Sequence, residues 1–395
     1  MYDALSRTHK LKTTEQRDML YGFYGLLQVL SDCRLPAPDL NLPVPLVWMN
    51  GTIAMIRGSQ SLRVMQDVVN DDRCQVHRHG YLCPQQRSRL AKQDLVEPRW
   101  THLWRNAPRE KALGWTIQDY RFNHKPPRNT AWDRAPELWS AQDSKSPLGE
   151  ITAMSGSLVV QGVRLDVIHK RNAQPDFMTR LLDKSSSKDS GVELDEALGG
   201  QSGMFISMTY VLREWLDIIQ KSRERSPPAD IFHDMMMFEL NPVALYGADY
   251  GNQAVALDIR TWCEVLMKSS SSGCGDLSHQ REVASILAED LKNMHGKKFA
   301  QQICINIIWK CAFRTAEGRV GYTWYTAEEG DLLVLLCWSR MPAILRPMRQ
   351  SKLASSELDN GPERYLLVGF AYVHGLMDCS KWPMQEDKLE DFILV

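Results

Sequence analysis

Short apolar runs near the end of the chain, each closed by turn-forming residues, constrain the fold more than any other feature of the sequence. They are too short for helices and are rich in Val, Leu, Ile, Phe and Tyr, which is typical of strands. The runs occupy residues 303–313, 332–338, 342–346 and 365–373. Gly, Pro, Asp and Ser clusters separate them, so the pattern predicts a β-meander of antiparallel strands.

Turn residues set the boundaries of this meander. Glu317-Gly318 predicts a turn between two strands, and Gly330-Asp331 predicts a turn into an apolar strand. Gly369 indicates a bulge or a close backbone approach inside the last run. Pro342 and Pro347 bracket residues 342–346, and proline cannot donate to a strand ladder, so this strand is predicted to lie at a sheet edge.

Helical periodicity dominates the earlier part of the chain. Helices are predicted over residues 14–31, 46–69 (broken near Gly58-Ser59), 204–222, 253–268 and 280–294. In the helix over 204–222 the predicted buried face is Leu212, Trp215, Leu216 and Ile219, with Arg213 and Glu214 off it. A strand pair is predicted within residues 150–170. The fold class is therefore α+β, with a helical N-terminal and central region packed on a C-terminal antiparallel β unit.

Composition excludes several broad classes of protein. The chain has 395 residues with 47 Lys+Arg and 48 Asp+Glu, so no basic excess points to nucleic acid. No apolar run of about 18 residues or more predicts a membrane span. The first residues lack a secretory signal, so we expect a cytoplasmic protein. Its nine cysteines should then be reduced. Apolar stretches contain most of them, for example Cys304, Cys311 and Cys337, which we interpret as small buried side chains.

One segment has the residue types of a metal site. Cys74, His77, His79 and Cys83 could supply four nitrogen and sulfur ligands to zinc. Structural zinc sites, however, separate two ligand pairs by a longer loop. Arg73, Arg78 and Arg87 would also oppose a dication. We therefore interpret the segment as a surface loop and assign no metal and no cofactor.

No catalytic residue is assigned from the sequence. His374 and Asp378 are spaced so that the carboxylate could orient a general base, but no activated nucleophile accompanies them. His374 is interpreted as a strand-end cap. Glu328, Glu329 and Asp331 are interpreted as a solvated turn. The run from Met235 to Phe238 is either core or an exposed apolar patch, with core favoured.

The same C-terminal stretch resembles the C-terminal signature of fungal heterokaryon-incompatibility (HET) proteins. That signature has a hairpin of the form T-x-x-G-x-x-G, then Gly-Asp with an apolar strand, then P-x-x-L-R-P, and finally Y-x-L-V-G-x-x-Y-V-H-G-x-M-D. The matching residues here are Thr315, Gly318 and Gly321; Gly330-Asp331; Pro342 with Leu345-Arg346-Pro347; and Tyr365 to Asp378.

Weaker resemblances cover earlier segments. Residues 17–26 resemble the RDKVYGLLGL segment at the end of the HET effector domain, and residues 158–168 resemble a strand of the same proteins. Residues 95–104 resemble LPSWVPDW, with Thr101-His102-Leu103 in place of its Val-Pro-Asp. Because the effector domain would precede residue 17, the resemblance implies a chain that lacks it, a truncated or degenerate copy.

The resemblance divides the chain into four parts. Residues 1–31 would be the remnant of the HET domain edge, 32–268 a mixed central region, 269–298 a linker and helix, and 299–395 the β-rich unit with the signature. The implied function is non-enzymatic and acts through unidentified protein partners, in nonself recognition or regulated cell death. An alternative is an accessory protein or enzyme of a fungal secondary-metabolite pathway, which a deep pocket with perturbed titratable groups would favour.

Overall fold

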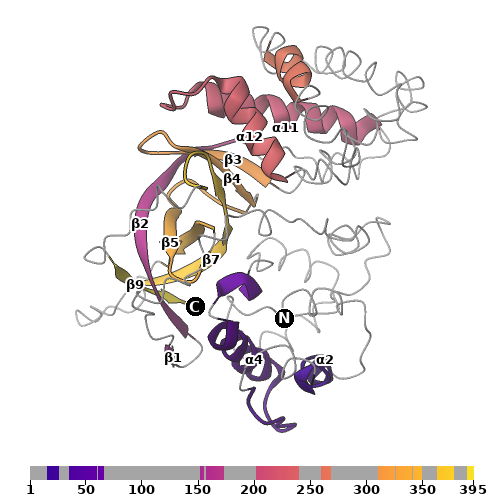
Figure 1. The fold of residues 1–395 in the computed structure, drawn as a ribbon, viewed down its shortest axis with the longest axis vertical. Coiled ribbons are helices and arrows are strands. Elements are labelled where there is room, and N and C mark those ends of the chain that lie inside the picture. The colour runs from indigo at the N-terminus through magenta and orange to yellow at the C-terminus, as the bar shows by residue number, and fades with distance from the viewer. Residues whose placement is uncertain are drawn as a thin grey trace, which may run out of the picture.

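The structure is a computed structural model. It describes residues 16–25, 35–59, 61–65, 152–154, 157–172, 202–239, 259–267, 310–324, 326–339, 341–348, 363–377 and 389–395. Within these residues helices and a mostly antiparallel sheet are mixed, which agrees with the predicted α+β class. One set of helices lies at each end of the sheet (Figure 1).

The helices at one end come from the N-terminal part of the chain. They are α2 (Gln16–Tyr21), α4 (Val44–Ser59) and the 3-10 helix η1 (Leu62–Met65). Helix α4 ends at Gly58-Ser59, as the sequence predicts. At the other end lie α11 (Ser202–Gln220), α12 (Pro228–Glu239) and a helical stretch over residues 259–267. The helix predicted over 280–294 lies outside the described residues.

The sheet has nine strands. They are β1 (Thr152–Met154), β2 (Ser157–Arg171), β3 (Lys310–Thr315), β4 (Val320–Trp324), β5 (Leu332–Leu336), β6 (Ala343–Pro347), β7 (Arg364–Phe370), β8 (Tyr372–Val373) and β9 (Glu390–Leu394). The strand pair predicted within 150–170 is confirmed, because β1 and β2 pair antiparallel. The predicted turns at Gly318 and Gly330 are also confirmed, with φ of 91° and 96°.

The strand pairings close on themselves, and β2 is the strand that closes them. Gly162 pairs with Leu336 of β5 and with Glu390 of β9, so these two strands lie on opposite edges of β2. From β9 the pairing continues through β7 and β6 back to β5. Farther along β2, Ile168 and Lys170 pair with β3, which leads to β4 and β8. The predicted antiparallel meander is therefore confirmed only for β3–β4 and for β5–β6–β7, because β4 pairs with β8 instead of β5 and β7 pairs parallel with β9. Strand β2, from the middle of the chain, joins the two parts.

The prediction that the strand between Pro342 and Pro347 lies at an edge is wrong. Strand β6 lies between β5 and β7. Both prolines stand at the ends of the strand, where a missing N–H interrupts little of the ladder. The carbonyl of Pro342 also accepts a hydrogen bond from the amide of Ala371 at 2.8 Å. The local sequence is thus compatible with an interior strand.

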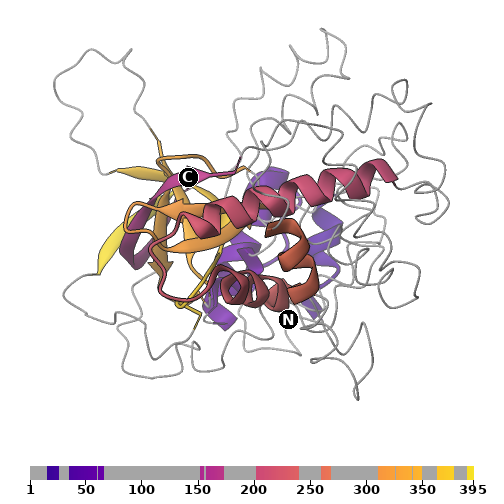
Figure 2. The ribbon, with the colours of Figure 1, turned by 90° about the horizontal axis from the view of Figure 1, so that it is seen from above.

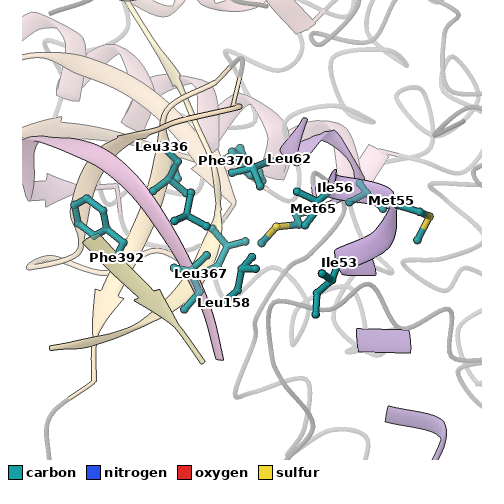
Figure 3. Close-up of a cluster of buried hydrophobic side chains, with 14 of the residues drawn as sticks. Ile53, Met55, Ile56, Leu62, Met65, Leu158, Leu336, Leu367, Phe370 and Phe392 are labelled. Carbon is teal, nitrogen blue, oxygen red and sulfur yellow. The ribbon is translucent and has the colours of Figure 1, made fainter. Parts of the chain in front are cut away.

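Hydrophobic cores cover both faces of the strands. Leu332, Val334 and Leu336 of β5 join a core with α2, α4 and η1, part of which Figure 3 shows. Leu333 points to the other face, into a core with Phe313 of β3. Burial on both faces explains why β5 consists of apolar residues without alternation.

A separate core joins α11 and α12 to strands β3, β4 and β8, and Figure 2 shows α11 crossing over this part of the sheet. We call it the α11 core. The predicted buried face of α11 is confirmed for all its members: Leu212, Trp215, Leu216 and Ile219. Arg213, predicted to lie off that face, is nevertheless buried, with 4% of it exposed, so α11 is covered on more than the predicted face. Met235 and Met236 are buried in the same core, as favoured above.

Candidate functional site: the polar contacts of the tail

An ion pair joins the Gly-Asp and Leu-Arg-Pro segments. Arg346 donates from Nε to Asp331 Oδ1 at 2.8 Å and from Nη2 to Asp331 Oδ2 at 3.0 Å. Its Nη2 also donates to the carbonyl of Thr326 at 2.7 Å, and the amide of Glu328 donates to Asp331 Oδ2 at 2.7 Å. The Asp331 side chain is 3% exposed. The interpretation of Asp331 as part of a solvated turn is therefore wrong, although Glu328 and Glu329 are exposed.

The hairpin between β3 and β4 is held by a second buried carboxylate. Asp166 on β2 accepts from the amide of Val167 at 2.8 Å and from the amide of Glu317 at 3.2 Å. Thr315 Oγ1 accepts from the amide of Arg319 across the turn at 3.0 Å. These bonds satisfy backbone donors that the turn leaves unpaired. The bond from Glu317 to Asp166 holds the hairpin on β2.

Two glycines of the signature make room for close packing. A Cβ on Gly321 would lie 2.2 Å from the carbonyl oxygen of Tyr372, and one on Gly369 would lie 2.6 Å from Cδ1 of Trp324. Both distances are far below van der Waals contact. At Gly369 the register between β6 and β7 also shifts, so the predicted bulge with close backbone approach is confirmed.

His374 is placed by its backbone and faces a carboxylate on another element. Its backbone amide donates to the carbonyl of Val320 at 2.8 Å at the end of β8, whereas its ring Nδ1 has no hydrogen-bond partner among the described residues, so a cap by the side chain is not seen at this atom. Its Nδ1 lies 3.7 Å from Asp234 Oδ2 on α12, and His233 Nδ1 lies 3.2 Å from Asp234 Oδ1. The predicted partner, Asp378, lies outside the described residues.

The neighbouring carboxylate does not orient the His374 ring by a hydrogen bond. A separation of 3.7 Å exceeds hydrogen-bond length, so Asp234 does not fix the tautomer of the ring. Within the described residues, Nδ1 of His374 has no hydrogen-bond partner. The cluster of His233, Asp234 and His374 brings polar side chains of α12 next to the end of β8.

The predicted zinc segment with Cys74, His77, His79 and Cys83 lies outside the described residues. In the part of the chain that is described, no group of three or more His, Cys, Asp or Glu side chains is arranged to hold a metal ion. The helices described there include none long and apolar enough to cross a membrane.

Burial makes one cysteine thiol resistant to reaction. Cys311 is buried, as predicted, and desolvation raises the pKa of its thiol to about 12. Cys337 is half-buried rather than buried, and desolvation raises its pKa as well. A raised pKa lowers the thiolate fraction at neutral pH, and the thiolate is the nucleophile.

We expect iodoacetamide at pH 8 to label Cys337 before Cys311 in the folded protein. Peptide mass mapping at successive times will measure the two rates. Faster labelling of Cys311 would contradict its burial.

Sequence reasoning missed the partners of the tail's polar residues. Asp331 and Arg346 were both noted as motif residues, and their opposite charges on adjoining apolar strands were the available signal. Nothing in the sequence near either residue indicates that Asp234 lies beside His374.

In comparisons with known proteins, no family model matches the chain, and neither a curated protein nor a solved structure matches it.

Proposed function

We propose that this chain is a non-enzymatic protein of the heterokaryon-incompatibility type, acting in the cytoplasm through protein contacts in fungal nonself recognition or regulated cell death. The observation that carries the proposal is the ion pair between Asp331 and Arg346. The resemblance rests on separate pieces of sequence, and two of these pieces are direct partners in the fold. A chance likeness of short motifs gives no reason for such a contact.

The remaining motif residues support an architectural role. Thr315 and Gly318 form the hairpin turn, and Gly321 and Gly369 admit neighbouring groups. The amide of His374 closes the end of β8. Each contact stabilises a folding unit, and catalysis requires none of them. A folding unit built from such contacts suits a binding or scaffold role.

The proposal is tested by co-expression. The full chain is produced in a filamentous fungal host together with a HET-domain protein that carries the effector domain. We expect co-purification of the two proteins and a changed frequency of cell death, scored with a vital dye. The matched control is the Arg346→Leu chain, which should lose both effects because the tail unit is weakened. If the intact chain neither binds nor alters cell death, the proposal is wrong.

A further inference from the structure

The connector between α11 and α12 has the sequence that certain protein kinases select. Residues 222–228 are Ser-Arg-Glu-Arg-Ser-Pro-Pro. Ser226 is followed by Pro227 and has Arg223 three residues before it and Arg225 directly before it. We propose that Ser226 is a phosphorylation site for a proline-directed serine kinase that also selects arginine. This inference does not depend on the proposed function.

The chemistry of the neighbours explains the selection. Proline after the acceptor has no N–H, so it can enter an apolar subsite where an ordinary amide would be left unsatisfied. Arginine before the acceptor can pair with carboxylates that line a kinase substrate groove. Arg223 and Arg225 are both exposed in the structure.

The connector has a conformation that a kinase can accept. Because Ser226 precedes a proline, a helical backbone is disfavoured there, and the structure has a bend at Arg225 and Ser226. Exposed and half-buried residues alternate from Lys221 to Pro227, and Ser226 is half-buried. Within the described residues, the amide of Arg223 donates to the carbonyl of Gly318 at 3.3 Å, and residues 224–226 make no backbone hydrogen bond to another element. Few bonds hold this segment, so opening it to expose the hydroxyl costs little.

The modification is an ordinary phosphoryl transfer. Ser226 Oγ attacks the γ-phosphorus of a nucleoside triphosphate bound to the kinase, and a new O–P bond forms. The bond from that phosphorus to the β–γ bridging oxygen breaks, and the nucleoside diphosphate leaves. The hydroxyl proton passes to the catalytic aspartate of the kinase. No oxidant or reductant is involved.

A phosphate on Ser226 would lie where positive charge is available. It adds a charge of about −2 just before Pro228, the first residue of α12, and next to Arg225. Arg223 already packs on the β3–β4 turn, since a Cβ on Gly318 would lie 2.7 Å from Cβ of Arg223. Glu224 and Asp230 are the nearby acids and reduce this attraction. A phosphate paired with Arg223 would link the connector to the hairpin and raise the melting temperature.

The test uses the folded full chain, magnesium ATP and a proline-directed serine kinase, with phosphopeptide mapping by mass spectrometry. We expect phosphate on Ser226, its loss in Ser226→Ala, and weaker incorporation in Arg223→Gln. The sequence provides an internal control, because Ser146-Pro147 is the other Ser-Pro pair and has Asp143 at the position that Arg223 occupies. Ser146 should therefore be the poorer substrate.

Two results would overturn the proposal. One is phosphate on Ser146 with none on Ser226, and the other is modification of Ser226 only after the chain has been denatured. The link to the hairpin has its own measurement. The phosphorylated chain should have a higher melting temperature than the Ser226→Ala chain treated in the same way. An equal or lower melting temperature would contradict the pairing of the phosphate with Arg223.

Discussion

Replacing Arg346 by leucine is expected to lower the free energy of unfolding by about 3 kcal/mol. The substitution removes a positive charge beside the Asp331 carboxylate, whose side chain is 3% exposed, and it leaves Asp331 without the bidentate partner that offsets its desolvation. The bond to the carbonyl of Thr326 is lost as well. Urea denaturation followed by circular dichroism will measure the effect as a lower midpoint.

The matched control is an exposed ion pair in the same unit. Arg319 and Glu317 are 3.1 Å apart, with side chains that are 35% and 62% exposed. Exposed pairs contribute about 0–1 kcal/mol, so Arg319→Leu should move the midpoint much less. Equal midpoints for the two leucine variants would show that burial of Asp331 adds nothing to the pair.

Replacing Trp215 by alanine should destabilise the protein by about 3–5 kcal/mol, the usual range for deletion of a large buried aromatic side chain. Trp215 is fully buried, and its ring stacks on Tyr322 at 5.3 Å between centroids. Tyr322 in turn stacks on Tyr372 at 5.2 Å. The three rings join α11 to β4 and β8, so their loss should separate the helix from the sheet. The same denaturation experiment measures the change.

Two further variants separate stacking from burial. Trp215→Phe keeps an apolar ring and should cost less than Trp215→Ala. A double-mutant cycle with Tyr322→Leu should give a coupling of about 0.5–1.5 kcal/mol, the value for an aromatic pair beyond its buried area. As a surface control, Leu40→Ala removes a side chain that is 65% exposed and should leave stability unchanged. A coupling near zero would mean that the stacked geometry contributes nothing.

Local patterns predicted the elements of the tail well. Strands β3, β5, β6 and β7 fall within or overlap the predicted apolar runs, because short runs between turn residues have few other solutions. The turns at Gly318 and Gly330 followed from residues that tolerate positive φ. The buried face of α11 followed from helical periodicity.

Long-range partners could not be predicted in the same way. Strand β6 was predicted to lie at an edge because prolines flank it. Its actual position depends on the pairing of β2 with β5, which the sequence near β6 does not indicate. Asp331 was assigned to solvent because its neighbours are glycine and glutamates, whereas Arg346 stands 15 residues later. His374 was matched with nearby Asp378, whereas the described structure places Asp234 of α12 beside it. Periodicity carries no information about such pairs.

Closure of the sheet by β2 also restricts how another protein can dock. Among the described strands, only the short β1 and β8 have a strand neighbour on one side alone. A partner that extends a sheet needs a row of unpaired backbone amides and carbonyls as its template. Among the described strands such a row is left in the short β1 and β8, and in β7 beyond Tyr365, where its pairing with β9 ends. Strand addition to the described part of the sheet is therefore restricted to these short stretches, because the apolar strands β5 and β6 are paired on both sides.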